Sequence, residues 1–217
     1  MRKLILGLCL LLTVTAMFAQ EAKFQELTGT VEFQRSGSSV WEKAVQGQTI
    51  MPDTIISTGF KSYALLSIGN SQITVRPLTR LSVKEISART ETETVNSSLA
   101  TGRIHADINP PAGARASATV QTPMAVASVR GTTFEINIYE LWVMEGSVQF
   151  TGTSGVPVIV DAGGYSYINY KTGWAVSPIE GLRILLDPDM PIGNDFEGTN
   201  SAQRNSTGGF TSPFVYK

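Results

Sequence analysis

Apolar and polar residues alternate along most of the chain, which is the pattern of strands that bury one face. The clearest run covers residues 62–76 and predicts two strands joined at Gly69-Asn70, a pair that accepts the positive φ of a two-residue hairpin. Further strands are predicted near 27–34, 40–45, 80–87, 101–108, 118–122, 132–138, 141–150, 157–161 and 165–170. Turn residues separate them at roughly the eight-to-twelve-residue spacing of sandwiches and barrels. The pattern predicts no amphipathic helix beyond a short turn around 178–186.

Three segments place a glycine between apolar residues of one strand face. They are Leu27-x-Gly29-x-Val31, Ala100-x-Gly102-x-Ile104 and Met144-x-Gly146-x-Val148. Because glycine lets the backbone bend or approach a neighbour closely, each segment predicts a corner where a strand enters a stacked layer. Their unequal spacing excludes a regular repeat array. We therefore predict an all-β fold, a layered sandwich or flattened solenoid-like domain of about 10–12 short strands.

The N-terminus has the pattern of a secretory signal peptide. Met1-Arg2-Lys3 is a basic start, and an apolar run from Leu4 to Val14 follows it. We expect cleavage after Ala19, so that the mature chain begins at Gln20 and lies in the periplasm or at the outer-membrane periphery. Two alternatives stay open: Met17 is large for its place three residues before the cut, which favours retention as an anchor, and Cys9 is a candidate lipid attachment site.

The predicted organisation has three parts. Residues 1–19 form the signal peptide, 20–176 the β domain and 177–217 a C-terminal extension. From Asp187 onward the extension is rich in Gly, Asn, Ser, Thr and Pro, so we expect it to be mostly irregular or disordered. No second apolar run approaches the length of a membrane span, so no transmembrane segment is expected after cleavage.

Composition narrows the function further. Charged residues make up 16% of the chain, and the formal net charge is -1 with no cluster of one sign, so a nucleic-acid partner is not expected. Cys9 is the only cysteine and leaves with the signal peptide. The mature chain is therefore predicted to have no disulfide and no thiolate metal ligand.

One segment has a recognisable signature. Residues 122–136 read Thr-Pro-Met-Ala-Val-Ala-Ser-Val-Arg-Gly-Thr-Thr-Phe-Glu-Ile, which resembles the FecR domain, where Thr-Pro leads through small apolar residues to Arg-Gly-Thr and Phe. Stretches at 29–31, 51–59, 64–70, 99–104, 143–148 and 161–163 follow the order of the same family, from about residue 24 to 170. A departure is Gly69-Asn70, which stands where the family usually has Asp-Gly.

The resemblance implies an envelope-facing domain that contacts other proteins. Family members of the iron-transport regulator type also carry a cytoplasmic anti-sigma segment, a transmembrane helix and a C-terminal signalling module. The sequence shows no counterpart of these, so we expect a stand-alone secreted FecR-like protein and not a transcriptional regulator.

Arg130 in the signature needs its own interpretation. On an unbroken strand it shares the parity of Val126 and Phe134, the more apolar face. A buried guanidinium requires a carboxylate, so we favour an anchoring ion pair with Asp53 as partner, and we expect Arg130→Ala to destabilise the fold by about 2–4 kcal/mol. Glu145 has the parity opposite to the core-facing residues and is the weaker partner. Recognition of an anionic ligand is the alternative role of Arg130.

The sequence predicts no catalytic residue, no cofactor and no metal site. His105, the single histidine, lies between Arg103 and Asp107 on an outward strand face, and a His-x-Asp pair supplies only two metal ligands. No Gly-x-Ser-x-Gly motif accompanies the many serines. The carboxylates that a glycosidase-type pair would need are Glu85, Glu91, Glu93, Glu140 and Glu145, and most are better interpreted as outward charges. The acidic stretch 187–197 lacks the spacing of a calcium loop.

We therefore expect a non-enzymatic envelope protein that binds another protein or a cell-envelope component. The alternatives are a small outer-membrane or periplasmic β protein that binds a polysaccharide or lipid, and a cryptic enzyme. The expected contact surfaces are the sheet edges and the apolar residues of the extension, because unpaired strand edges and extended segments exchange main-chain hydrogen bonds with a partner. Those apolar residues are Phe196, Phe210, Phe214, Val215 and Tyr216.

Overall fold

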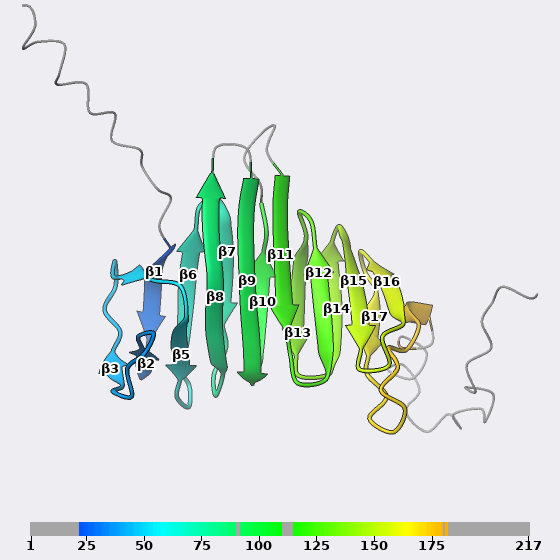
Figure 1. Ribbon diagram of the computed structural model, residues 1–217, viewed down its shortest axis with the longest axis horizontal. Helices are drawn as coiled ribbons and strands as arrows, with labels where there is room; N and C mark the ends of the chain where they lie inside the picture. The colour runs from blue at the N-terminus through cyan, green and yellow to red at the C-terminus, as the bar shows by residue number, and fades with distance from the viewer. Residues whose placement is uncertain (1–21, 90–91, 110–114, 180, 182–217) are drawn as a thin grey trace, which may run out of the picture.

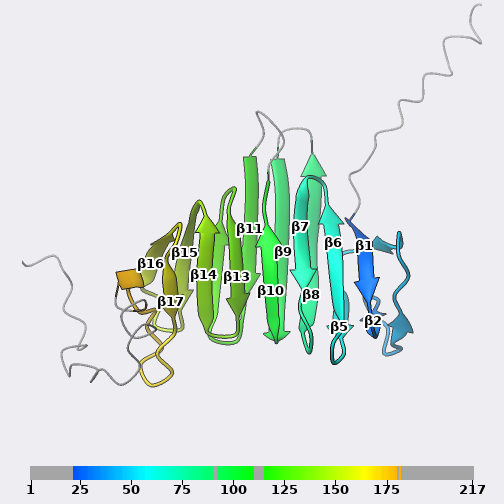
Figure 2. The ribbon, with the colours of Figure 1, turned by 180° about the vertical axis from the view of Figure 1, so that it is seen from behind.

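The computed structural model of the 217-residue chain describes residues 22–89, 92–109, 115–179 and 181 (Figure 1). These residues form 17 β-strands in two sheets that pack face to face as an all-β sandwich (Figures 1 and 2). Among the described residues, no helix has both the length and the apolar character needed to cross a membrane. The predicted signal peptide, and the extension apart from 177–179 and 181, lie outside the described residues.

Sheet A has eight strands and sheet B has nine. The order in sheet A is β17 (Tyr165–Tyr167), β14 (Glu140–Glu145), β13 (Thr133–Asn137), β10 (Arg103–Asp107), β7 (Ser71–Val75), β6 (Tyr63–Ile68), β1 (Ala22–Thr28) and β4 (Thr49–Ile50). The order in sheet B is β16 (Pro157–Asp161), β15 (Ser147–Gly152), β12 (Ala125–Val129), β11 (Arg115–Gln121), β9 (Thr92–Thr101), β8 (Arg80–Arg89), β5 (Thr54–Thr58), β2 (Val31–Gln34) and β3 (Glu42–Lys43). Neighbouring strands are antiparallel except β9 and β11, which are parallel.

The chain passes repeatedly between the two sheets while it advances along the long axis of the molecule, so early strands lie at one end and late strands at the other (Figures 1 and 2). Alternate side chains from both sheets meet between them in one apolar cluster that runs from Ala22 to Ala175. Phe24, Phe134 and Phe150 are its largest members, each with no exposed surface. Burial of these side chains is the main favourable contribution to the stability of the sandwich.

The predicted glycine corners are confirmed. Gly29 and Gly146 lie where the chain leaves sheet A for sheet B, and Gly102 lies where it returns to sheet A, with φ of 72°, 77° and 86°. Glycine alone adopts such angles at little cost. The runs predicted as single strands at 27–34 and 141–150 are therefore each two strands in different sheets, which is one reason why the structure has more strands than predicted.

Four further strands escaped the sequence pattern, and one of them, β4, has only two residues. β5, β9 and β12 are rich in Thr, Ser and Ala, so their inward and outward positions differ little in hydrophobicity. The predicted hairpin is present as β6 and β7, with a positive φ of 57° at Gly69 and none at Asn70. Glycine at the first of the two turn positions is typical of a type II′ turn.

Candidate functional site

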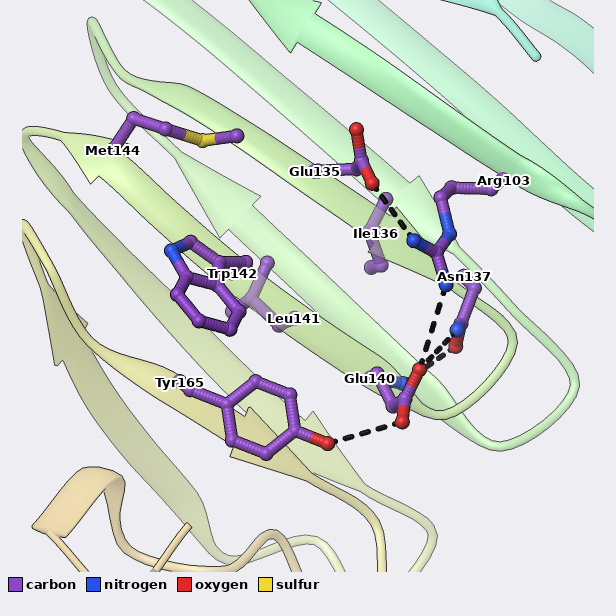
Figure 3. A pocket seen from close by; sticks show the side chains of 9 residues that line it. All are labelled: Arg103, Glu135, Ile136, Asn137, Glu140, Leu141, Trp142, Met144 and Tyr165. Carbon is purple, nitrogen blue, oxygen red and sulfur yellow. Dashed lines mark hydrogen bonds and ion pairs between the residues drawn. The ribbon is translucent and has the colours of Figure 1, made fainter. Parts of the chain in front are cut away.

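A shallow depression of about 200 Å³ lies on the outer face of sheet A (Figure 3). Strands β10, β13, β14 and β17 supply its walls, because consecutive strands of this part of sheet A lie side by side. Its lining residues are Arg103, Glu135, Ile136, Asn137, Glu140, Leu141, Trp142, Met144 and Tyr165. One wall is aromatic and the other is formed by hydrogen-bonded polar side chains (Figure 3).

The aromatic wall is built by cross-strand pairing. Trp142 on β14 is directly opposite Tyr165 on β17, and their ring centroids are 5.5 Å apart with an angle of 54° between the rings. Tyr167 follows Tyr165 on the same face, 6.2 Å from ring to ring. Because Leu141 and Val143 are fully buried, the alternation of β14 holds Trp142 and Met144 outward, each 39% exposed. The wall is therefore fixed by the strand register.

The polar wall is a connected network of side chains. Arg103 donates to Glu135 at 2.9 Å, and its second terminal nitrogen lies 3.8 Å from Glu140. Arg76 donates to the other oxygen of Glu135 at 3.1 Å. The Asn137 amide donates to Glu140, and its oxygen accepts the backbone N–H of Glu140 at 2.8 Å. These planar groups hold one another in place, so the network restricts their orientations.

Tyr165 connects the two walls. Its hydroxyl donates to the Glu140 carboxylate at 3.0 Å (Figure 3). Burial, and then the neighbouring Glu140 charge, raise the pKa of Tyr165 well above its ordinary value. The phenol therefore stays protonated at physiological pH and acts as a hydrogen-bond donor.

A second surface is the outer edge of β16, the last strand of sheet B. On one side β16 pairs with β15, and no strand of the described chain pairs with its other side. Ile159 on this strand is 55% exposed and Val156, just before it, is 42% exposed. The structure thus leaves an apolar strand edge open at this end of the sandwich.

The comparisons with known proteins agree with the signature in the sequence. The family model described as FecR protein matches residues 54–149, from the start of β5 to the middle of β15. This chain carries a FecR domain. No curated protein sequence matches the chain significantly.

Two solved structures of a candidate anti-sigma factor from Parabacteroides distasonis ATCC 8503 are similar to the chain. The first is 13% identical, with a TM-score of 0.46, and the matched region covers 60% of this chain and 63% of the chain in that structure. The second is 14% identical, with a TM-score of 0.45, and the matched region covers 61% of this chain and 64% of the chain in that structure. The chain therefore spans less than two thirds of the length of these structures.

The threonines of the FecR signature hold corners of the sandwich. The Thr122 hydroxyl donates to the backbone oxygen of Ile138 at 2.7 Å and accepts the backbone N–H of Ala125 at 2.9 Å. The Thr132 hydroxyl donates to the backbone oxygen of Ser147 at 3.1 Å. Both threonines are buried, so their hydroxyls satisfy backbone groups that water does not reach. This part of the signature is structural.

The anchoring role predicted for Arg130 is wrong. Arg130 is exposed, follows the end of β12 and makes no hydrogen bond or ion pair with the described residues. The strand breaks at Gly131, where φ is 65°, and both Arg130 and Gly131 lie outside while Val129 and Thr132 point inward. Counting alternate residues along one unbroken strand therefore predicts the wrong face for Arg130.

The partner proposed for Arg130 is engaged elsewhere. Asp53 lies in an exposed turn with a positive φ of 60°, and its carboxylate is 3.6 Å from the ammonium of Lys84. Glu145, the weaker candidate, is exposed at the end of β14. Neither candidate carboxylate therefore anchors Arg130, and recognition of an anionic ligand is the alternative that stands untested.

His105 lies on the outward face of β10, as predicted, because Ile104, Ala106 and Ile108 are buried. It is opposite Glu135, and its Nδ1 is buried without a hydrogen-bond partner. Within the described residues, no group of three or more His, Cys, Asp or Glu side chains is placed to hold a metal ion.

The carboxylates considered as a catalytic pair have separate environments. Glu85 accepts a hydrogen bond from Asn96 on the exposed side of sheet B, at 2.8 Å. Glu93 is buried and accepts the backbone N–H of Asn70 at 3.4 Å. Glu140 lies in the depression on the other sheet, and Glu91 lies outside the described residues.

The depression was not foreseen from the sequence. Glu140 was considered only as an acid, and Trp142 and Tyr165 were not singled out. The alternation of β14 and of β17 does predict that Trp142, Met144, Tyr165 and Tyr167 share outward faces. What the alternation does not contain is the pairing of β14 with β17, which brings these faces together.

Proposed function

We propose that this chain is an exported, non-enzymatic protein of the periplasm or outer-membrane periphery whose FecR domain binds an extended segment of another envelope protein at the free edge of β16. The observation that carries the proposal is that β16, an apolar strand at one end of the sandwich, pairs on only one side within the part of the chain that the structure describes. Such an edge is a template for strand addition, in which main-chain hydrogen bonds supply affinity and alternate side chains supply specificity.

The free side of β16 has hydrogen-bonding groups to offer. In an antiparallel pair, successive residues point their N–H and C=O groups alternately toward and away from the partner strand. Residues 157, 159 and 161 form one set, and residues 158 and 160 form the other. Because Pro157 has no N–H, either set leaves two N–H groups of this strand on the free side. An incoming strand would satisfy them.

The other three strand edges are less suited to a partner. β3 and β4 have two residues each, which is too short for a stable ladder. The edge of β17 is covered by the chain itself, because the backbone N–H of Val176 donates to the oxygen of Tyr167 at 2.9 Å and Ile168 pairs with Ala175. β16 has five residues and no such cover among the described residues.

The side chains of β16 indicate what the partner strand contains. Ile159 projects outward, Val160 is fully buried between the sheets, and the half-buried Val158 packs against the core. A partner strand beside β16 would place side chains next to the outward Ile159 and next to the inward valines. It is therefore expected to carry β-branched or aromatic residues at alternate positions. Asp161 is the only charged residue on this strand, so like-charge repulsion does little to protect the edge.

Site-specific photocrosslinking in the native host tests this proposal. A benzoylphenylalanine in place of Ile159 should crosslink one defined envelope protein, whereas the same group in place of Gln121, exposed at the centre of sheet B, should not. Ile159→Lys in a chain with the crosslinker at Val156 should abolish the adduct, because an edge lysine opposes strand pairing. Ile159→Val, which keeps a β-branched side chain, is the matched control and should preserve it.

Four results would contradict the proposal. Equal crosslinking from Gln121 and Ile159 would place the contact elsewhere, and an adduct that survives Ile159→Lys would exclude strand addition. An adduct with the mass of two copies of this chain would identify a homodimer and not a partner protein. Release of the chain from cells by osmotic shock would support its export, while recovery only with the cytoplasm would contradict it.

A further inference from the structure

We propose that the depression on sheet A is a carbohydrate-binding site that takes one pyranose ring of a neutral glycan. This site is separate from the edge of β16 and does not depend on strand addition there. The proposal rests on the aromatic wall, the polar wall and the balance of charge between them (Figure 3).

The aromatic wall offers an apolar face to a sugar ring. The axial C–H groups of a pyranose form apolar patches, and these pack on the faces of Trp and Tyr rings, which combine apolar area with a polar atom. Trp142 and Tyr165 are inclined at 54° to each other, so they form an angled wall and not a flat one. The indole N–H of Trp142 makes no hydrogen bond within the described chain, so it is available to a ligand.

The polar wall offers groups suited to sugar hydroxyls. A carboxylate has about four acceptor positions. Glu140 uses two of them for Asn137 and Tyr165, and Glu135 uses two for Arg76 and Arg103. Arg103 lies 3.8 Å from Glu140, as an ion pair beyond hydrogen-bond distance. The remaining acceptors and the guanidinium donors face a ligand from fixed positions. A hydroxyl is both donor and acceptor, so a polyol can satisfy both kinds of group.

Charge and size favour a neutral sugar over other ligands. Arg76 and Arg103 balance Glu135 and Glu140, so the network has no net charge to attract an anionic polymer or a strongly basic peptide. A volume of about 200 Å³ lies below the roughly 300–1,000 Å³ of sites for drug-sized molecules. It is on the scale of one sugar ring. A polymer would extend beyond it across the open face of the sheet.

The test uses the full mature chain and four defined probes. These are hexamers of β-1,4-linked N-acetylglucosamine, β-1,4-linked glucose and α-1,4-linked glucose, with oligogalacturonate as an anionic control. Saturation-transfer NMR and titration calorimetry at millimolar probe concentration should detect binding of at least one neutral hexamer and weaker or no binding of oligogalacturonate.

Variants decide whether the depression is responsible. Trp142→Ala should weaken binding at least tenfold, because an aromatic anchor of this kind contributes more than about 1.4 kcal/mol. Trp174→Ala is the matched control, since Trp174 is similarly exposed at 41% and lies outside the depression, and it should leave the affinity unchanged. Circular dichroism and melting of each variant confirm that the fold is intact. Ile159→Lys should bind sugar as the parent does, so failure of the strand-addition proposal would not affect this result.

Several outcomes would overturn the inference. Absence of binding by all three neutral hexamers would do so, as would binding that survives Trp142→Ala or is lost equally in Trp174→Ala. Oligogalacturonate as the tightest ligand would show that charge is recognised. If a photocrosslinker at Met144 captured a protein in the native host and no hexamer bound, the depression would be a second protein contact.

Discussion

Thr79 occupies the space that a side chain at Gly102 would need. A Cβ at residue 102 would overlap the Thr79 hydroxyl and lie 2.5 Å from the Thr79 Cα, and the same hydroxyl accepts the backbone N–H of Arg103 at 3.0 Å. Gly29 has the same relationship with Ser62, whose hydroxyl accepts the backbone N–H of Thr30 at 2.8 Å. At both corners, therefore, the glycine packs directly against a hydroxyl-bearing residue from another corner of the chain.

Gly102→Ala should destabilise the fold by about 2–4 kcal/mol, because it adds both a strained backbone and an overlap with Thr79. Urea unfolding followed by circular dichroism measures the change. Gly155→Ala is the matched control, since Gly155 has a similar φ of 82° and no atom lies within 4 Å of the position that its Cβ would take. It should cost only the backbone strain, about 1–2 kcal/mol. Equal losses in the two variants would show that the stacked corner adds nothing.

Thr122→Val should destabilise the domain by about 1–3 kcal/mol, although the two side chains have nearly the same shape. The substitution leaves the backbone oxygen of Ile138 and the backbone N–H of Ala125 without their hydroxyl partner in a buried corner. Thr122→Ser keeps the hydroxyl and should retain most of the stability. If valine and serine gave the same melting curve, the hydroxyl would not be the reason for this threonine.

Arg130→Ala should change the free energy of unfolding by less than about 0.5 kcal/mol, because Arg130 is exposed and makes no ion pair with the described residues. This reverses the expectation from the sequence. Chemical denaturation of the parent and the variant under the same conditions measures the difference. A loss of about 2 kcal/mol or more would restore the anchoring role.

The sequence predicted correctly which side chains point inward where apolar and polar residues alternate without a break along a strand. The alternation through residues 103–108 placed Ile104, Ala106 and Ile108 inward and His105 outward, and the structure agrees. At Arg130 the same reasoning failed, because Gly131 turns the chain into the other sheet and shifts the parity by one residue. The glycine pattern identified such corners at residues 29, 102 and 146, but the corner at Gly131 was interpreted as part of one strand.

The candidate sites depend on which strands are neighbours, and a local pattern does not contain that information. Trp142 meets Tyr165 only because β14 pairs with β17, and β16 is an edge strand because, within the described residues, β15 is its single neighbour. Burial periodicity fixes which face a side chain occupies, whereas strand order and register fix what it meets there. The fold class was therefore predictable from this chain, and the two surfaces required the structure.

Stability should fall above pH of about 10 more steeply in the parent than in Tyr165→Phe. In the unfolded chain Tyr165 loses its proton near pH 10, whereas in the folded chain burial and Glu140 raise the pKa of Tyr165. Above pH 10 the unfolded state therefore binds fewer protons, and the free energy of unfolding decreases as pH rises. Urea midpoints at pH values of about 8.5 and 10.5 measure the decrease on the two sides of the ordinary tyrosine pKa.

Tyr170→Phe, at an exposed tyrosine outside the depression, is the matched control, and its stability should decline with pH as that of the parent does. Equal declines in the parent and Tyr165→Phe would show that the phenol of Tyr165 titrates alike in both states, and its bond to Glu140 would then be weaker than the geometry indicates.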